Sequence, residues 1–262
     1  MQFIDTHTHL YLPEFSDDRD EAVKRAVSNG VTLMLMPNID ILSVGRMLET
    51  ENRYSSLCYS MIGLHPTSVK EDYLSQLDEL EAIFNRHKFI AIGEIGIDLY
   101  WDKSFIAEQI IAMRRQITFA LEKDLPVVIH SRDSFPEVFS VLGEFAGKKL
   151  RGVFHAFSGN ADDATRAVRI GFKLGIGGVV TFKNSGLDKV LETVGPENLI
   201  LETDSPYLAP VPYRGKRNES SYICIINKKI ADIYGMNEEE MAGITYANSV
   251  SLFNLETLYE KR

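Results

Sequence analysis

The stretch DTHTHL, residues 5 to 10, decides how the rest of the chain is interpreted. It follows the largely apolar residues 1–4, which look like the start of a buried β-strand, yet it carries two histidines and an aspartate. Alternate residues of a strand face the same side, so Asp5, His7 and His9 are expected to share one inward face. Buried polar side chains cost free energy unless they find partners. Those partners must come from other parts of the sequence.

Seven further apolar runs follow along the chain, each short and nearly continuous in its apolar character. Such runs are typical of parallel strands that are buried on both faces. Amphipathic segments separate them, and a final helix through residues 241–253 is expected to be capped by Asn237 with Glu240. The other helical segments are residues 17–30, 105–124, 134–147 and 160–171. The eight apolar runs end at His7, Met36, His65, Glu94, His130, His155, Gly178 and Asp204.

The spacing of these ends predicts the fold. Successive ends lie between 23 residues (155 to 178) and 36 residues (94 to 130) apart, which accommodates one strand, one helix and two loops. Eight such units predict an α/β fold, a closed (β/α)8 TIM barrel, which typically needs about 250 residues. We expect one domain over residues 1–262. An open doubly wound sheet is the alternative, but the first strand lacks the Gly-rich turn typical of nucleotide folds.

Charge and cysteine content limit the partners and the compartment. The net charge of −9 is unfavourable for general nucleic-acid binding, because phosphate affinity depends mainly on Lys and Arg. A nucleic-acid substrate would need a local basic patch or a metal. Cys58 and Cys224 are expected to be buried free thiols in a reducing cytosol. There is no signal-peptide pattern and no membrane-length apolar run, so we expect a soluble, cytoplasmic monomer.

Polar residues gather at the predicted strand ends. Five of the six histidines lie there, and only His87 is expected on the surface, at a helix end. In a (β/α)8 barrel the C-terminal strand ends converge on one mouth, where active sites are built. Imidazole and carboxylate groups buried together at this mouth form a ligand set for divalent metal ions. The candidate ligands are His7, His9, Glu94, His130, His155 and Asp204.

Two metal ions are expected, because six candidate ligands exceed what one tetrahedral ion needs. Glu94 is the candidate bridge, since a carboxylate can join two ions some 3.5–4 Å apart. The ligand types leave the metal open among Zn²⁺, Mn²⁺, Fe, Ni and Mg²⁺. The natural division, with Glu94 shared, gives one ion His7, His9 and Asp204 and the other His130 and His155.

Seven motifs, taken together and in order, resemble the TatD family of metal-dependent hydrolases, which includes deoxyribonucleases. They are DTHTHL, GLHP, GEIGIDLYWD, VIHSRD, FHAFSG, LGIGGVVTFKNS and LETDSPYLAPVPYRGKRNES, and they extend over essentially the whole chain. The resemblance implies an amidohydrolase-like barrel, the same six metal ligands, and hydrolysis of phosphodiester bonds. It typically implies trimming of DNA from a 3′ end with Mg²⁺. Thr67, Ala156 and Ser220 stand where the family often has histidine, cysteine and proline, and none of them is a ligand.

Individual roles can be assigned within this set. We expect Asp204 to act as the general base that accepts a proton from water, with Glu94 beside it, and a purely ligating Asp204 is the alternative. His65, which the resemblance places near the substrate phosphate, is expected to donate to a phosphate oxygen, with a capping or loop hydrogen bond as the alternative. Asp5 and Glu202 are expected to orient ligating histidines, with simple packing as the alternative for Glu202.

The segment after the eighth predicted strand is rich in cations. Loops after strands 7 and 8 often bind phosphate in these barrels, together with a helix N-terminus that Asn218 is expected to cap here. A solvated loop is the alternative. The candidate phosphate-binding residues are His65, Arg214, Lys216 and Arg217. Three aromatic residues near the mouth are candidates for stacking on a base, or for loop packing: Tyr100, Trp101 and Tyr207.

Three functions fit the sequence. The first is a divalent-metal nuclease, a TatD-type DNase with 3′–5′ exonuclease activity that takes DNA 3′ ends as substrate and uses metal-activated water. The second is a metal-dependent hydrolase of a small-molecule ester, amide or phosphoester on the same barrel. The third is a metal-stabilised barrel that serves only as an interaction module.

Overall fold

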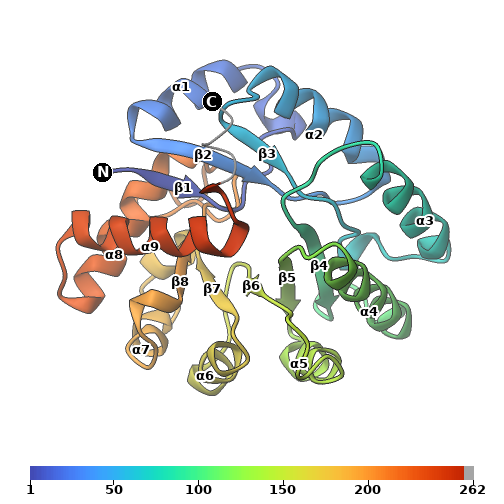
Figure 1. The fold of residues 1–262 in the computed structure, drawn as a ribbon. Helices are drawn as coiled ribbons and strands as arrows, with labels where there is room; N and C mark the ends of the chain where they lie inside the picture. The colour runs from blue at the N-terminus through green and yellow to red at the C-terminus, as the bar shows by residue number, and fades with distance from the viewer. Residues whose placement is uncertain (257–262) are drawn as a thin grey trace.

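Eight parallel strands form a ring that helices surround, as Figure 1 shows. The structure, a computed structural model, describes residues 1–256. Within two sheets, β1–β3 and β4–β8, each strand pairs in parallel with its neighbours in sequence, as the continuous apolar runs predict. The strands are β1 (Phe3–Asp5), β2 (Val31–Met36), β3 (Cys58–Ser60), β4 (Ile92–Asp98), β5 (Val127–Arg132), β6 (Gly152–Phe154), β7 (Lys173–Ile176) and β8 (Leu199–Leu201).

Two short bridges close the ring. The ladders run over β1–β3 and β4–β8, and a pair between Ile62 and Ile92 joins them on one side. On the other side Thr8 pairs with Ser205, and their hydroxyls lie 2.7 Å apart. The sheet is therefore a closed barrel, which confirms the (β/α)8 prediction and excludes the open doubly wound alternative.

Helices follow the strands in the predicted order, and the four amphipathic segments expected within the chain become α1, α4, α5 and α6. The side chain of Asn237 accepts a hydrogen bond of 2.7 Å from the amide of Glu240, which confirms the cap of the last helix. The helices are α1 (Arg19–Ser28), α2 (Ile41–Arg53), α3 (Tyr73–Phe84), α4 (Ile106–Glu122), α5 (Phe135–Gly143), α6 (Ala161–Arg169), α7 (Leu187–Leu191), α8 (Ile223–Tyr234) and α9 (Glu238–Phe253). The 3-10 turns are η1 (Pro13–Phe15), η2 (Pro66–Ser68), η3 (Gly178–Thr181), η4 (Pro196–Asn198) and η5 (Ser220–Tyr222).

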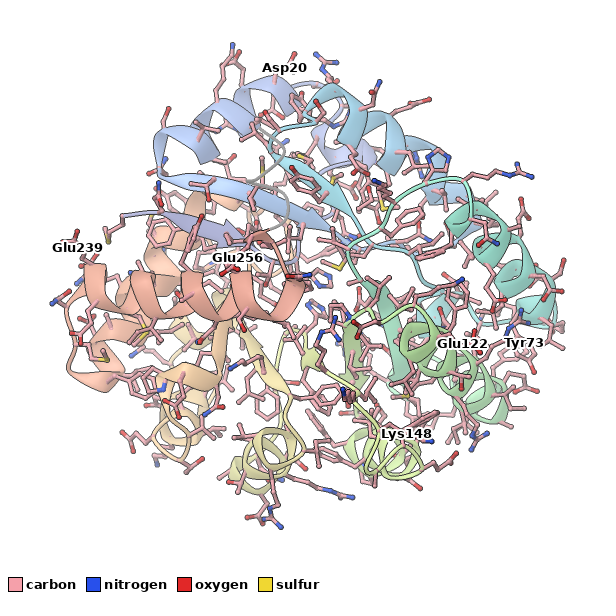
Figure 2. The ribbon with its side chains drawn as sticks, in the orientation of Figure 1. Asp20, Tyr73, Glu122, Lys148, Glu239 and Glu256 are labelled. Atoms are coloured by element: carbon pink, nitrogen blue, oxygen red, sulfur yellow. The ribbon has the colours of Figure 1, made fainter. Side chains whose placement is uncertain are left out.

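Two apolar clusters divide the inside of the ring from the outside. The larger cluster joins strand residues to helix residues, so it attaches the helices to the barrel. The smaller cluster fills the barrel interior, because it unites residues from or beside seven strands with the end of α9. Charged side chains lie outside, as Asp20 and Glu239 do at the rim of Figure 2. The interior cluster consists of Ile4, Leu33, Leu35, Met61, Ala91, Val128, Val153, Ile200, Leu252, Phe253 and Leu255.

Strand alternation places a polar layer above this apolar interior. Val128 faces the interior from β5, so His130, two residues later, faces the same way at the mouth. Val153 and His155 repeat the pattern at the end of β6. Strand alternation therefore places apolar side chains inside the barrel and histidines at its mouth.

Some details differ from the sequence prediction. β4 continues past Glu94 to Asp98, because its ladder with β5 persists as far as the pair Asp98–Arg132. Cys58 is fully buried, and burial raises the pKa of its thiol, whereas Cys224 is only half-buried. In the described part of the chain, no helix has both the length and the apolar character needed to cross a membrane. The single domain expected over 1–262 includes six residues, 257–262, that lie outside the described part.

Candidate metal centre

The two histidines of DTHTHL meet at the mouth of the barrel. β1 ends at Asp5, so regular strand alternation does not extend through His9, yet the Nε2 atoms of His7 and His9 lie 3.3 Å apart. Asp5 does not hold either imidazole ring. Its carboxylate accepts hydrogen bonds from the amide and hydroxyl of Thr203, at 2.9 and 2.6 Å, and a long one from the amide of His7. Asp5 therefore ties β1 to the chain after β8, and burial raises its pKa to about 7.

Glu94 lies at the centre of the site, and its two carboxylate oxygens face different groups. Oε2 lies 3.2 Å from Nε2 of His7 and 3.9 Å from Nε2 of His9. Oε1 lies 2.8 Å from Nδ1 of His130 and 3.4 Å from Nε2 of His155. The structure thus brings all four histidines around one carboxylate that is 2% exposed.

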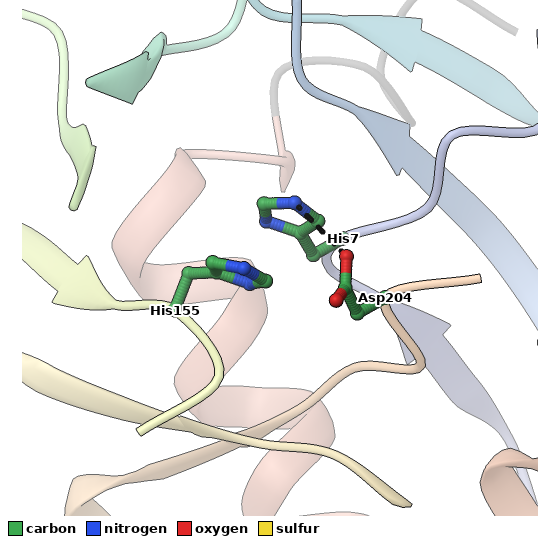
Figure 3. A group of neighbouring side chains, drawn as sticks. All are labelled: His7, His155 and Asp204. Carbon is green, nitrogen blue, oxygen red and sulfur yellow. Dashed lines mark ion pairs between the residues drawn. The ribbon is translucent and has the colours of Figure 1, made fainter. Parts of the chain in front are cut away.

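Asp204 completes the group on the His7 side. Its Oδ1 lies 3.6 Å from Nε2 of His9 and 3.8 Å from Nε2 of His7. Figure 3 shows His7 stacked on His155, with Asp204 beside the pair, and the two ring centroids lie 3.5 Å apart. The backbone of Asp204 has a φ of 56°, a left-handed conformation that non-glycine residues adopt uncommonly.

Two further carboxylates lie behind His130 and His155, next to the ring nitrogens that face away from Glu94. Oε1 of Glu202 lies 3.0 Å from Nδ1 of His155, and it also accepts from the amide of Ala156 at 2.7 Å. Oδ2 of Asp98 lies 2.9 Å from Nε2 of His130. The contact of Asp98 with His130 is a hydrogen bond, whereas Glu202 approaches His155 as an ion pair without hydrogen-bond geometry. In both pairs the other ring nitrogen is aimed at Glu94, an arrangement common around ligating histidines. Sequence reasoning missed Asp98, although its even spacing from Glu94 on β4 puts both on one face.

Tyr11, which the sequence also did not indicate, determines which ring nitrogen of His9 carries the proton. Its buried hydroxyl donates to the carbonyl of Pro37 at 2.8 Å, so the single hydroxyl proton is already used. The contact of 3.0 Å between this hydroxyl and Nδ1 of His9 must then have the imidazole as donor. Nε2 of His9 is consequently left with a free lone pair directed into the site.

His65 enters the site with the opposite tautomer. Its Nδ1 accepts a hydrogen bond from the amide of Thr67 at 3.2 Å, so in the neutral ring the proton sits on Nε2. That Nε2 lies 3.3 Å from both Oε1 of Glu94 and Nδ1 of His130. His65 therefore presents a donor to the site, whereas His9 presents an acceptor.

The carboxylates of the site favour the ionised form although they are buried. Burial alone would raise the pKa of Glu94, but the surrounding histidines hold that pKa well below its usual range. Burial likewise would raise the pKa of Asp204, and His9 and His155 outweigh it. Within residues 1–256, no Lys or Arg side chain pairs with any of the four buried carboxylates, which are Glu94, Asp98, Glu202 and Asp204.

The donor set fits divalent metal ions. Three groups of side chains have ligand atoms within 4.8 Å of one another: His7, His9 and Glu94; His7, His155 and Asp204; His65, Glu94 and His130. Nitrogen and carboxylate oxygen donors of this kind suit Zn, Mn, Fe or Mg.

Of the three cations in the loop after β8, one is engaged in an ion pair and two are exposed. Arg217 is bound by Asp18 through two hydrogen bonds of 2.6 and 2.8 Å, and it also donates to the carbonyl of Glu14. It is therefore engaged in holding the loop and is not free for phosphate. Arg214 and Lys216 are exposed, and the guanidinium of Arg214 lies 4.5 Å from the ring centroid of Phe182, in the loop after β7.

The expected cap by Asn218 is wrong. Its amide nitrogen donates to the carbonyls of Thr203 and Tyr207, both at 2.7 Å, so this buried side chain holds the loop against the end of β8.

Two further residues named from the sequence lie on the surface. His87 is exposed, as expected. Tyr207 is 47% exposed, with its ring 6.1 Å from that of His9.

Comparison with known proteins agrees with this geometry. The family model described as TatD related DNase matches residues 4–254. YabD of Bacillus subtilis, named an uncharacterized metal-dependent hydrolase, is 37% identical over 96% of this chain and 98% of its own. The 3'-5' ssDNA/RNA exonuclease TatD of Pantoea ananatis is 30% identical, covering 96% and 99% of the two chains. The crystal structure of YjjV, a TatD homolog of Escherichia coli, has a TM-score of 0.90 at 30% identity, covering 96% and 98%. The chain therefore belongs to the TatD family of metal-dependent hydrolases.

Proposed function

We propose that the protein is a two-metal phosphodiesterase that removes nucleotides from the 3′ ends of DNA. The observation that carries the proposal is Glu94, whose two oxygens face two separate groups of histidines, 3.2 Å from His7 and 2.8 Å from His130. A bridged pair of ions is the usual device for in-line displacement at phosphorus. The name of the Pantoea ananatis relative, an exonuclease, supports the choice of substrate.

The chain's own residues divide the work. Divalent ions held by His7, His9, Glu94, His130, His155 and Asp204 supply Lewis acidity and lower the pKa of coordinated water towards ~7. Asp204, whose pKa is held below its usual value, is the proton acceptor for the attacking water. His65 donates from Nε2 to a phosphate oxygen. Arg214 and Lys216 attract the neighbouring phosphates of the strand.

The direct test is degradation of DNA labelled at the 3′ or the 5′ end, single- and double-stranded, with Mg²⁺, Mn²⁺ or Zn²⁺. Stepwise loss from the 3′ end is expected. Glu94→Gln and His130→Ala should each reduce the rate by at least about 100-fold, since each removes a ligand. His87→Ala, at an exposed histidine that is not one of the candidate ligands, is the matched control and should retain full activity. Retention of activity in both ligand variants would contradict the proposal.

The alternative substrate is a small ester, amide or phosphoester. It is favoured by the acidic net charge of −9 and by the engagement of Arg217 with Asp18, which leaves Arg214 and Lys216 as the free cations of that loop. The double variant Arg214→Ala, Lys216→Ala separates the two. DNA cleavage should fall and lose much of its salt dependence if the loop attracts phosphates, whereas a small neutral substrate should be cleaved as before.

A further inference from the structure

Two exposed aromatic rings and one arginine form a platform beside the metal centre. Tyr100 and Trp101 follow β4 and are 54% and 69% exposed. Their rings meet edge to face, with centroids 4.9 Å apart. Arg132, the last residue of β5, places its guanidinium carbon 3.9 Å from the Tyr100 centroid and 5.3 Å from that of Trp101. These three residues are called the aromatic platform below.

The platform is held in place by its backbone. Oδ1 of Asp98 accepts hydrogen bonds from the amides of Tyr100 and Trp101, at 3.0 and 3.2 Å. The amide of Leu99 donates to the carbonyl of Arg132 at 2.9 Å, which links the two supporting strands. These backbone contacts hold the loop while the ring of Trp101 stays 69% exposed, so one face of the ring is accessible to a ligand.

Asp98 also connects the platform to the reaction centre. Its Oδ1 holds the amides of the two aromatic residues, while its Oδ2 holds Nε2 of His130 at 2.9 Å. Nδ1 of His130 in turn lies 2.8 Å from Glu94. The backbone that carries the two aromatic rings is therefore linked through one carboxylate to the candidate ligand His130.

The aromatic rings and the arginine indicate what kind of ligand the platform would bind. An exposed aromatic ring such as that of Trp101 can bind a planar π-system on its face, and the positive guanidinium favours a ring that is attached to a phosphate. We propose that the aromatic platform is a base-binding subsite, which stacks a nucleobase of a single-stranded substrate next to the phosphodiester bond that is cut. This inference rests on the proposed nuclease function and extends it to Tyr100, Trp101 and Arg132.

Trp101 provides a direct readout, because it is the only tryptophan in the chain. Metal-loaded protein is titrated with a phosphorothioate-linked oligothymidylate that resists cleavage. Saturable quenching of tryptophan fluorescence is expected. An abasic phosphorothioate oligonucleotide of equal length carries the same charge without bases and should leave the fluorescence unchanged. A ribose version of the oligonucleotide tells whether the subsite distinguishes DNA from RNA.

Variants test the role in cleavage. Trp101→Ala should lower kcat/KM on single-stranded DNA by about 10-fold, within the range found for one base–aromatic stack. Trp101→Phe should restore most of it, because a flat ring remains. Hydrolysis of methyl p-nitrophenyl phosphate, which has no nucleobase, should depend on Trp101 much less than cleavage of DNA does. Ile111→Ala, an exposed apolar residue on the outer side of α4, is the matched control.

The outcomes separate the two proposals. If labelled DNA is cleaved but Trp101 fluorescence and Trp101→Ala kinetics stay unchanged, the subsite is wrong and the nuclease function stands. Equal quenching by the abasic oligonucleotide would also overturn the subsite, in favour of backbone binding. Fluorescence that changes with protein concentration alone would assign the platform to contact between two copies of the chain. If no DNA is cleaved, the nuclease function itself fails.

Discussion

Three of the four candidate ligand rings each have a different supporting neighbour. Tyr11 fixes the tautomer of His9, Asp98 holds His130, and Glu202 holds His155. Burial alone would lower the pKa of His155, but Glu202 and Glu94 raise it to about 10. The three supports differ chemically, so each can be tested by a separate substitution.

Asp98→Asn tests the support of His130. Loss of the carboxylate should lower metal affinity by about 10- to 100-fold, as is typical when the partner of a ligating histidine is removed. Titration calorimetry with Mn²⁺ measures this directly. Asp102→Asn is the control, because Asp102 is an exposed carboxylate of the same loop that pairs with Lys70. Equal affinities in both variants would refute the role of Asp98.

Gly175 makes room for Glu202. A Cβ at Gly175 would lie 2.2 Å from Oε2 of Glu202, whereas a Cβ at Gly177 would meet the same residue at 3.7 Å, an ordinary contact. Gly175→Ala should therefore destabilise the protein by about 1–3 kcal/mol, as overpacking in a core does. Gly177→Ala should change the free energy of unfolding much less. Urea denaturation of the two variants provides the comparison, and equal midpoints would contradict it.

Among the elements, the loop after β8 is anchored to α1 by an ion-pair network. Arg217 binds Asp18 at 2.6 Å, and Arg25 of α1 binds Glu219 at 2.6 Å. The network fastens the segment that carries Arg214 and Lys216 to the first helix of the barrel. Its partners lie some 200 residues apart in the sequence, so no local pattern distinguishes Arg217 from its two neighbouring cations.

This network predicts a pH dependence of stability. The hydrogen bonds from Arg217 hold the pKa of Asp18 below its usual value of 3.8. A depressed carboxyl pKa stabilises the folded state above pH ~4, and this contribution is lost as the pH falls through the folded-state pKa. Asp18→Asn should lower the free energy of unfolding at pH 7 by about 1 kcal/mol or less, because solvent screens the pair.

Thermal unfolding between pH 2 and pH 7 measures the effect of Asp18. The wild-type protein should lose stability below pH ~4 more steeply than Asp18→Asn does. Asp17→Asn, at the exposed neighbouring residue, is the control and should follow the wild-type curve. Parallel curves for wild type and Asp18→Asn would rule out the contribution of the network.

At the scale of the whole molecule, the site also connects the first and last strands of the barrel. His7 and Asp204 approach each other across the junction of β1 and β8, at 3.8 Å, and Asp5 binds Thr203 at the same junction. A metal bound to His7, His9 and Asp204 would therefore join the two ends of the barrel, in addition to any chemistry.

Metal binding should consequently stabilise the fold. A ligand at 100 times its dissociation constant contributes about 2.7 kcal/mol, which is a rise of several degrees in Tm. Differential scanning calorimetry with Mn²⁺, and again with a chelator, measures the shift. In Glu94→Gln the rise should be much smaller, because the shared ligand is lost. An identical rise in this variant would show that the metal binds elsewhere.

Several features of the site could be predicted because strand alternation is a local rule. His130 and His155 follow inward-facing valines by two residues, so their direction is set by the sequence. Asp98 obeys the same rule and was missed because β4 was taken to end at Glu94. The role of Tyr11 could not be predicted, because it depends on a hydrogen bond from its hydroxyl to the backbone carbonyl of Pro37, and no sequence pattern indicates such a bond.

The sequence by itself determined the barrel class, the strand order and the family, because apolar runs, helix periods and ordered motifs are properties of the chain. Only the tertiary structure decided which cations are free, which histidine donates and which accepts, and where the exposed aromatic rings lie. Those properties depend on atoms brought within about 3 Å of each other from distant segments, as Arg217 meets Asp18 and Tyr100 meets Arg132.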